Sequence, residues 1–279
     1  MSIWEYYDEP IDVPWEERRA RDPKTDEAKA RLVKLFEENP ERVFFGRQIE
    51  VLLEKDFFHW ITSRALAELV AERKIKSEKV ALRTGIDVRF CTAKGNRYWK
   101  RQAKKVGDLI LDYSDHAFTR ALGRHGELMF DAALPTVGFL PKAKDVREYG
   151  GKEWEETEHN LDRVFECEGV PYGAEVKNTL DYIPVEELDV KLKMCAALEL
   201  KPLFIMRWAP KNYMKRIIDA GGIGLVFEYQ LYPFGYEALA KRVREELGLK
   251  VDCPTRIADG TMQRLLKAHR RQTGKKGGA

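Results

Sequence analysis

The spacing of apolar residues divides the chain into a helical first part and a second part in which strands and helices alternate. In the first part, apolar residues recur at helix spacing in three runs. The first run ends at Asn39-Pro40, the second covers 46–55, and the third begins at Thr62-Ser63, which we interpret as N-caps. Two short β-prone runs follow, at 80–82 and 86–91. The pattern predicts three short helices and a small hairpin.

The second part begins with a long helical run over about 98–134, with a break expected at Ser114-Asp115. The continuous apolar run at 203–206 is typical of a strand buried on both faces. The other elements that we expect are a short strand near 143–146, a hairpin within 161–179, helices over 185–200, 213–220 and 236–247, and a strand over 223–227. This order predicts an α/β fold with a mixed β-sheet flanked by helices.

The hairpin within 161–179 carries a cluster of charged residues. With the turn centred on Glu168-Gly169, where glycine tolerates a positive φ, Asp162 lies directly opposite Glu175. Two facing carboxylates repel each other and destabilise a sheet unless a cation lies between them. Because side chains alternate along a strand, Lys177 shares the face of Glu175. The residues expected on the opposite face, towards a core, are Phe165, Ala174 and Val176.

Length and composition indicate a soluble globular protein. At 279 residues, with 44% hydrophobic and 34% charged residues, the chain suits two domains. No apolar run approaches membrane-spanning length, and the start lacks the pattern of a signal peptide, so we expect a cytoplasmic, nucleoid-associated protein without a membrane partner. The four cysteines are far apart, which argues against a zinc site or a disulfide framework and favours reduced thiols.

Local basic patches, and not the net charge of +3, point to a polyanion partner. The chain from Arg264 onward is basic and lacks acids, which leaves the remainder slightly acidic. The stretch 93–105 also lacks acids, and it interleaves Tyr98 and Trp99 with cations. This mixture suits phosphate contact and base stacking, although a solvated helix face over two packed aromatics would give the same pattern. The cations proposed to bind nucleic acid here are Lys94, Arg97, Lys100, Arg101 and Lys104.

The three helices and hairpin of the first part resemble a winged helix-turn-helix domain. The stretch 64–69 would then lie on the recognition helix, and Arg64 would contact DNA. Winged helices also serve as protein-docking modules, so both interpretations stay open at this point.

The order of elements in the second part, with its acids, resembles the PD-(D/E)XK nuclease superfamily, in the style of archaeal Holliday junction resolvases and Mrr-like or type II restriction endonucleases. That family has a glutamate on the first core helix, an aspartate on the second strand and E-x-K on the third. Here Glu127 occurs in HGELMFDAAL, Asp162 in NLDRVFE, and Glu175 and Lys177 in YGAEVKN. Leu161 replaces the proline of the motif's name. The resemblance covers about 118–251.

The resemblance implies a restriction-endonuclease-like fold and a catalytic set of Glu127, Asp162, Glu175 and Lys177. Mg²⁺ or Mn²⁺ would be held by Asp162, Glu175 and the backbone carbonyl of Val176, and Glu127 would contribute directly or through a water molecule. Lys177 would orient or help deprotonate the attacking water and offset developing charge.

Two lysines of the following helix, Lys191 and Lys193, would contact the phosphate backbone under the same resemblance. The predicted function is a metal-dependent DNA endonuclease of structure-selective, restriction or repair type, acting on double-stranded or branched DNA as a homodimer. The alternatives are a non-catalytic DNA-binding protein with a nuclease fold and an RNA endonuclease.

The predicted domain organisation has five parts. They are an aromatic, acidic arm at 1–25, a winged-helix-like α+β domain at 26–95, a basic helical linker at 96–115, a nuclease domain at 116–255 and a basic tail at 256–279.

Overall fold

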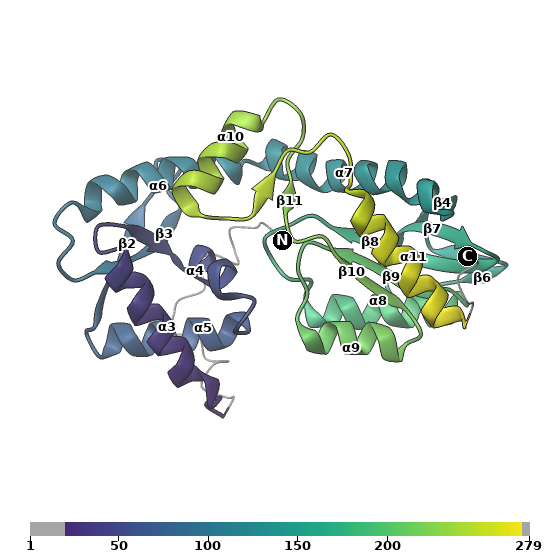
Figure 1. Ribbon diagram of the computed structural model, residues 1–279, viewed down its shortest axis with the longest axis horizontal. Helices are drawn as coiled ribbons and strands as arrows, with labels where there is room; N and C mark the ends of the chain where they lie inside the picture. Colours follow the sequence, from purple (N-terminus) through teal and green to yellow (C-terminus); the bar gives the residue numbers. More distant parts are fainter. Residues whose placement is uncertain (1–19, 275–279) are drawn as a thin grey trace. The chain divides into compact units, whose positions relative to one another are not determined.

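The computed structural model describes residues 20–274, and the chain divides into two compact units (Figure 1). Unit 1 comprises Met1–Phe118 and Lys241–Leu249. Unit 2 comprises Thr119–Ala240 and Lys250–Ala279. Most of the arm predicted at 1–25 lies outside the described residues.

Unit 1 contains the three helices and the hairpin that the apolar spacing predicted. The helices are α3 (Lys24–Glu38), α4 (Gly46–Leu53) and α5 (His59–Ala71). The strands are β1 (Val43–Phe45), β2 (Ile75–Ala81) and β3 (Asp87–Ala93), in the antiparallel order β1-β3-β2. Strand β1 was not predicted, because its three buried residues are too few to show a period.

Helix α5 begins earlier than the sequence suggested, and the N-cap prediction was wrong. Its N-cap is Phe58, in an extended conformation, whereas Thr62 and Ser63 lie inside the helix. Thr62 is buried, and the hydroxyl of Ser63 donates a hydrogen bond to Glu50 of α4. Both residues therefore serve the packing of α5 and not its start.

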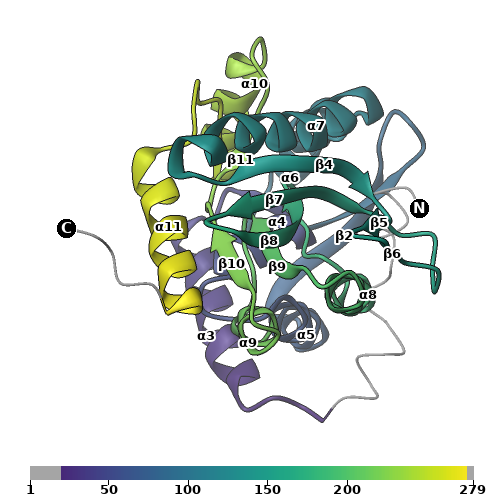
Figure 2. The same ribbon diagram turned by 90° about the vertical axis from the view of Figure 1, so that its right-hand side faces the viewer.

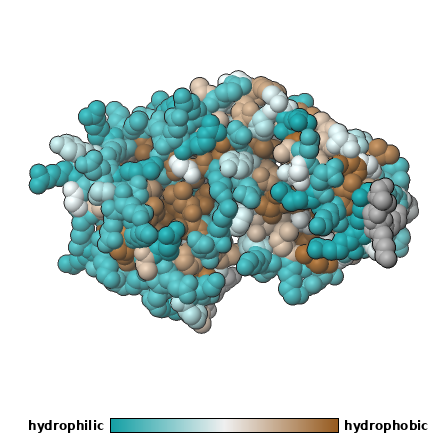
Figure 3. Space-filling view, in the orientation of Figure 1, coloured by the Kyte–Doolittle hydropathy of each residue, from teal (hydrophilic) through white to brown (hydrophobic). Residues whose placement is uncertain are grey.

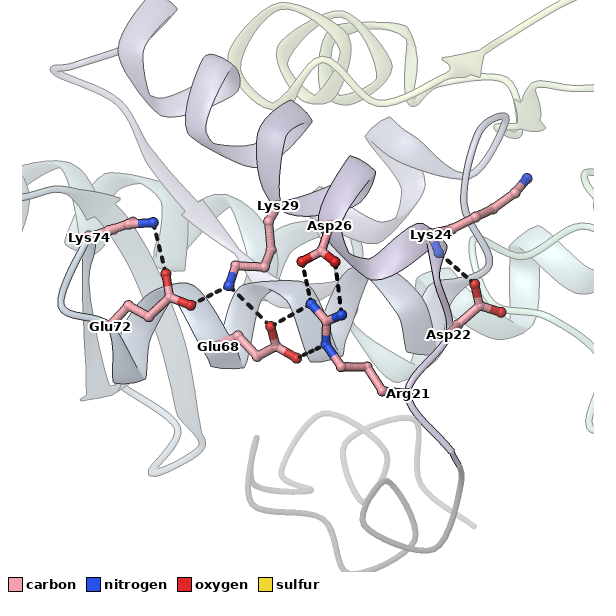
Figure 4. Close-up of polar contacts among 8 residues, drawn as sticks. All are labelled: Arg21, Asp22, Lys24, Asp26, Lys29, Glu68, Glu72 and Lys74. Carbon is pink, nitrogen blue, oxygen red and sulfur yellow. Dashed lines mark hydrogen bonds and ion pairs between the residues drawn. The ribbon is translucent and has the colours of Figure 1, made fainter.

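A network of charged side chains joins the start of α3 to α5 (Figure 4). The Nε of Arg21 lies 2.8 Å from Glu68 Oε1, and the Nζ of Lys29 lies 3.1 Å from Glu68 Oε2. Arg21 also pairs with Asp26, and Lys29 with Glu72. A surface ion pair is worth only about 0–1 kcal/mol, but a shared network fixes how two helices face each other. The acids of α5 are thus neutralised by neighbouring cations within unit 1.

The predicted basic linker, 96–115, forms α6 (Trp99–Tyr113), and it packs as part of unit 1. Ala103, Leu109 and Ile110 are buried along its inner face. Helix α6 ends at Tyr113, with Ser114 as its C-cap, and α7 (His116–Ala133) follows, so the predicted break at Ser114-Asp115 is confirmed.

Unit 2 is built on a mixed five-stranded sheet, as predicted, in the order β10-β9-β8-β7-β4. Strands β4, β7 and β8 are antiparallel neighbours, whereas β8, β9 and β10 run parallel. The bounds are β4 (Leu140–Val146), β7 (Leu161–Cys167), β8 (Val170–Lys177), β9 (Lys201–Met206) and β10 (Ile223–Val226). A 3₁₀ turn at Leu134–Val137 leads into β4, and the hairpin of β5 (Glu148–Tyr149) and β6 (Lys152–Glu153) follows it.

Helices cover both faces of this sheet (Figure 2). One face packs on α7 and α11 (Asp259–Thr273), and the other on α8 (Val185–Ala197) and α9 (Lys211–Asp219). The remaining elements are the parallel pair of β11 (Gln230–Leu231) and β12 (Val251–Asp252), and α10 (Glu237–Arg242), which continues as a π-helical turn at Val243–Leu247. This π-helical turn belongs to unit 1, where Gln48 Nε2 donates to the carbonyl of Leu247 at 2.7 Å.

The segment 256–279 was predicted to be a basic tail, but most of it folds onto unit 2. Through Thr273 it forms the amphipathic helix α11, with Met262 and Leu265 in the core of unit 2. Burying two such side chains contributes about 1.5–3 kcal/mol each, which explains why the segment folds onto the sheet. The positive charges obscured this short apolar stripe in the sequence.

The described residues contain no helix long and apolar enough to cross a membrane. All four cysteines are free, as expected, and Cys91, Cys167 and Cys195 are buried.

Gly126 of α7 is predicted to be required for close packing. An added Cβ would lie 2.6 Å from the Cβ of Asn178. We therefore expect Gly126→Ala to destabilise the protein by about 1–3 kcal/mol through overpacking, despite the better helix propensity of alanine. Gly123→Ala is the matched control, because nothing lies within 4 Å of its added Cβ, and we expect it to stabilise the same helix. Urea denaturation measures both, and equal effects of the two variants would contradict the packing.

Candidate active site

The β7–β8 hairpin has the register that the sequence predicted. Its turn residues, Glu168 and Gly169, have φ values of 50° and 79°, as two-residue hairpin turns require. Arg163 pairs with Ala174, and one further step of this register places Asp162 opposite Glu175. The residues of the opposite face, Phe165, Ala174 and Val176, lie in a core cluster with α7 and α11.

Glu175 is the most deeply buried acid of the hairpin, with 0% of its surface exposed. Lys191 Nζ lies 2.5 Å from its Oε1, and Lys177 Nζ lies 3.6 Å from its Oε2. The buried Oε2 accepts no hydrogen bond. Burial and the nearby Asp162 raise the pKa of Glu175 to about 7, although Lys177 and Lys191 oppose the rise.

Asp162 is half-buried and reaches across to β8. Its Oδ2 accepts a hydrogen bond of 2.8 Å from the backbone N–H of Val176. Val176 thus contacts the Asp162 carboxylate through its backbone N–H group. A contribution of its carbonyl group to metal binding stays a prediction.

Glu127 lies on α7 and pairs with Arg163, a residue for which the sequence predicted no role in the site. Arg163 Nη2 lies 3.3 Å from Glu127 Oε2 and 2.8 Å from Asp131 Oδ2. Burial and the charge of Asp162 raise the pKa of Glu127, whereas Arg163 opposes the rise. Asp162 therefore interacts electrostatically with both Glu127 and Glu175. Glu127 and Asp131 lie four residues apart, and therefore on one face of a helix. This spacing is the sequence feature that could have indicated a cation shared by the two acids.

Lys177 is placed between two carboxylates. Its Nζ lies 2.8 Å from Glu187 Oε1 of α8 and 3.6 Å from Glu175 Oε2. Burial lowers the pKa of Lys177, but the charges of Glu175 and Glu187 outweigh it, so the pKa is raised overall. The side chain is therefore a persistent ammonium group. This favours a role in charge stabilisation and hydrogen-bond donation, and disfavours proton abstraction from water.

Lys191 does not lie where the sequence analysis expected a phosphate contact. Only 4% of it is exposed, and it donates to Glu175 and to the carbonyl of Asn160. It lies three residues after the buried Leu188 on the inner face of α8. Lys193 points away from this face and is exposed, as expected of a surface lysine.

The donor chemistry of this site fits a hard divalent cation. Asp162 and Glu175 face each other, and the buried Glu175 Oε2 has no hydrogen-bond donor. Among residues 20–274, no three His, Cys, Asp or Glu side chains are grouped so as to hold a metal ion. Proteins usually bind Mg²⁺ through one or two carboxylates, with waters and substrate phosphates as the other ligands. A pair of carboxylates meets that requirement.

A second candidate surface is the start of α6, which we call the basic stripe: Lys94, Arg97, Lys100, Arg101 and Lys104. All five are exposed, and within the described part of the chain none is paired with an acid. Lys94 and Arg97 lie in the turns that precede α6, whereas Lys100, Arg101 and Lys104 lie on the helix. Lys104 follows Lys100 by four positions and Arg101 by three, which places these three cations close together on the helix surface. The face of the molecule in Figure 3 is mostly hydrophilic where α6 lies in Figure 1.

The two aromatics of this stretch differ in their surroundings. Tyr98 is 70% exposed, whereas Trp99 is half-buried, with Lys76 Nζ 4.4 Å from its ring centroid. Only Trp99 therefore fits the alternative of an aromatic packed beneath solvated charges. Arg64 is half-buried on α5 and interacts with other residues.

Comparisons of this chain with protein-family models, curated proteins and solved structures found no match in any of the three.

The Glu175–Lys191 pair is predicted to carry much of the local stability. Removing one partner of a buried pair leaves the other charge buried, so we expect Lys191→Met to destabilise the protein by about 3–5 kcal/mol. Adding Glu175→Gln should recover a large part of that loss. Chemical denaturation of the two single variants and the double variant measures the coupling. Additive effects would show that the two groups are not paired.

Proposed function

We propose that this chain is a metal-dependent endonuclease that cuts DNA. The observation that carries the proposal is the hairpin itself. Glu175 is buried with an oxygen that accepts no hydrogen bond, and it shares one face of the paired strands with Asp162 and Lys177. Acids aligned on adjacent strands can hold a metal ion, and a neighbouring lysine can stabilise the charge that develops when a phosphodiester is hydrolysed.

The positions of the acids in unit 2 agree with the PD-(D/E)XK pattern. Glu127 lies on α7, the helix before the sheet, Asp162 on the second strand of the sheet in chain order, and the Glu175-Lys177 motif on the third. This agreement supports a restriction-endonuclease-like fold. The helices and the β1-β3-β2 sheet of unit 1 likewise support a winged-helix-like domain.

Each residue of the site has a defined task under this proposal. Asp162 and Glu175 would hold Mg²⁺ or Mn²⁺, and the bound ion would supply Lewis-acid activation of the phosphate and of a water molecule. The Lys177 ammonium group donates hydrogen bonds to the phosphate oxygens and stabilises their developing charge. Arg163 holds Glu127 beside Asp162. We also propose a homodimer, because cutting both strands requires two sites related by a two-fold axis.

One observation favours a second candidate, a non-catalytic DNA-binding protein. Lys177 and Lys191 already place two positive charges at Glu175, which is what a structural acid needs. An RNA endonuclease would use the same site, and matched RNA substrates distinguish it from a DNA endonuclease.

The nuclease proposal is tested by variants that keep side-chain volume. We expect Asp162→Asn and Glu175→Gln to abolish cleavage, and Lys177→Met to slow it about 10²–10³-fold, the usual effect of removing one transition-state donor. Glu166→Gln is the control, since Glu166 lies on the same strand and pairs with Lys142. Linear, flapped, forked and four-way DNA and matched RNA are incubated with Mg²⁺ or Mn²⁺. Failure of the Asp162 and Glu175 variants to differ from Glu166→Gln would falsify the proposal.

The basic stripe is predicted to contact phosphates. We expect Arg101→Ala/Lys104→Ala to weaken DNA binding for every sequence, and to reduce the dependence of log K on log salt by about 2. Arg31→Ala/Lys34→Ala removes the same residue types at the same spacing from α3, and should leave that slope unchanged. Fluorescence anisotropy over a salt series measures both. Equal slopes for the two double variants would contradict the stripe as an interface.

A further inference from the structure

Exposed aromatic side chains gather in one segment of unit 2, residues 229–236, which we call the aromatic loop. Tyr229 is 45% exposed, Phe234 60% and Tyr236 37%. Water-exposed rings in such a short segment are unfavourable unless they bind something. Packing in the core of unit 2 does not explain why these rings are exposed.

Backbone hydrogen bonds hold the base of the aromatic loop in place. Gln230 N–H donates to the carbonyl of Lys250 at 2.9 Å, and Tyr232 N–H donates to that of Asp252 at 2.7 Å. Leu231 and Tyr232 are buried. The tip turns at Gly235, where φ is 88°. Phe234 thus stays 60% exposed although hydrogen bonds hold the base of the loop.

Asn178 ties this loop to the candidate active site. Its Nδ2 donates to the carbonyl of Leu231 at 2.7 Å, and its Oδ1 accepts from the N–H of Leu231 at 2.7 Å. Nδ2 also donates to the carbonyl of Leu122 of α7 at 2.8 Å. Asn178 directly follows Lys177, and three residues beyond Leu231 span at most about 10 Å. The ring of Phe234 therefore lies near the end of β8.

A second contact fixes Phe234 from the side of α7. Its ring is perpendicular to that of His125, with the centroids 6.3 Å apart. His125 precedes Gly126, which packs against Asn178. The loop also follows β10, and the carboxyl ends of the parallel strands β8, β9 and β10 meet at one edge of the sheet. Ligands of open α/β sheets bind outside such edges.

The chemistry of this edge fits a nucleotide. Arg124, next to His125, is exposed, and no ion pair joins it to an acid of residues 20–274. An aromatic ring stacks on any base, and a guanidinium group pairs with phosphate. In a blunt duplex the base faces are already covered by neighbouring bases. A ring held next to the cleaved phosphate would therefore favour a strand whose base at that point is unpaired.

We propose that Phe234 stacks on an unpaired base next to the phosphate that the site cleaves, so that the substrate is a flapped, forked or single strand. This inference rests on the proposed endonuclease function for the cleavage step. The stacking itself is a binding property and is measured without cleavage.

The experiment compares oligonucleotides of one sequence as a single strand, a blunt duplex and a duplex with a single-stranded flap. Binding to the full chain is followed by anisotropy in EDTA, where a metal-dependent nuclease does not cut. We expect Phe234→Ala to weaken binding of the single strand and the flap about tenfold, and to leave the duplex unchanged. Phe234→Trp should retain the affinity, whereas Phe234→Leu, which is apolar but cannot stack, should lose it.

Ile218→Ala is the matched control, because Ile218 is exposed on α9 of the same unit. Three results would overturn the inference: no change in Phe234→Ala, an equal loss for duplex and single strand, or a change in sedimentation that places Phe234 between two copies of the chain. Cleavage with Mg²⁺ is measured separately. Selective binding without cleavage would refute the proposed nuclease function and leave the stacking proposal intact. Cleavage of all three substrates at equal rates by Phe234→Ala and wild type would support the nuclease function and refute the stacking proposal.

Discussion

The burial of the Glu175 carboxylate is the constraint on which the rest of unit 2 depends. An acid with 0% exposure in a central strand requires positive partners, because the cost of removing its charge from water is several kcal/mol. Lys191 supplies one partner only if α8 packs with its inner face on the sheet, and Lys177 supplies the other from β8. The packing of α8 on the sheet and the neutralisation of Glu175 therefore depend on each other. A shift of α8 would leave Glu175 buried and uncompensated.

The two faces of the hairpin divide the charges between them. Glu175 and Lys177 interact with α8, whereas Arg163 turns the other way and pairs with the acids of α7. Asp162 acts electrostatically on both sides, since it raises the pKa of Glu127 and of Glu175. Neutralisation by lysine and coordination of a metal ion use the same carboxylate. Glu175 Oε2 accepts no hydrogen bond, and among the described residues its polar contact is an ion pair with Lys177 Nζ at 3.6 Å. This oxygen supports the proposal of a bound cation, because most buried polar atoms have a hydrogen-bond partner.

Local patterns predicted the features that depend on neighbouring residues. The hairpin register followed from one turn, and the break at Ser114-Asp115 from local polarity. Features that depend on distant residues were missed. Lys191 was interpreted as a surface lysine, because its partner Glu175 is sixteen positions away in the sequence. The segment of α11 was interpreted as a tail, because its few apolar residues pack on a sheet whose strands lie far away in the sequence.

The position of Asn178 links recognition to chemistry. One side chain bonds α7, the aromatic loop and, through the chain, the end of β8. An element fixed at three points does not move independently of its neighbours, so a base held by Phe234 would have a defined position relative to Lys177. Rate enhancement by orientation requires such fixed geometry, with reacting atoms about 3–3.5 Å apart. A loop tethered only by its own backbone would bind a base equally well but would not place the adjacent phosphate. Under the proposed function, the buried asparagine therefore connects the aromatic loop, on the α7 side of the sheet, to the strand that carries Glu175 and Lys177.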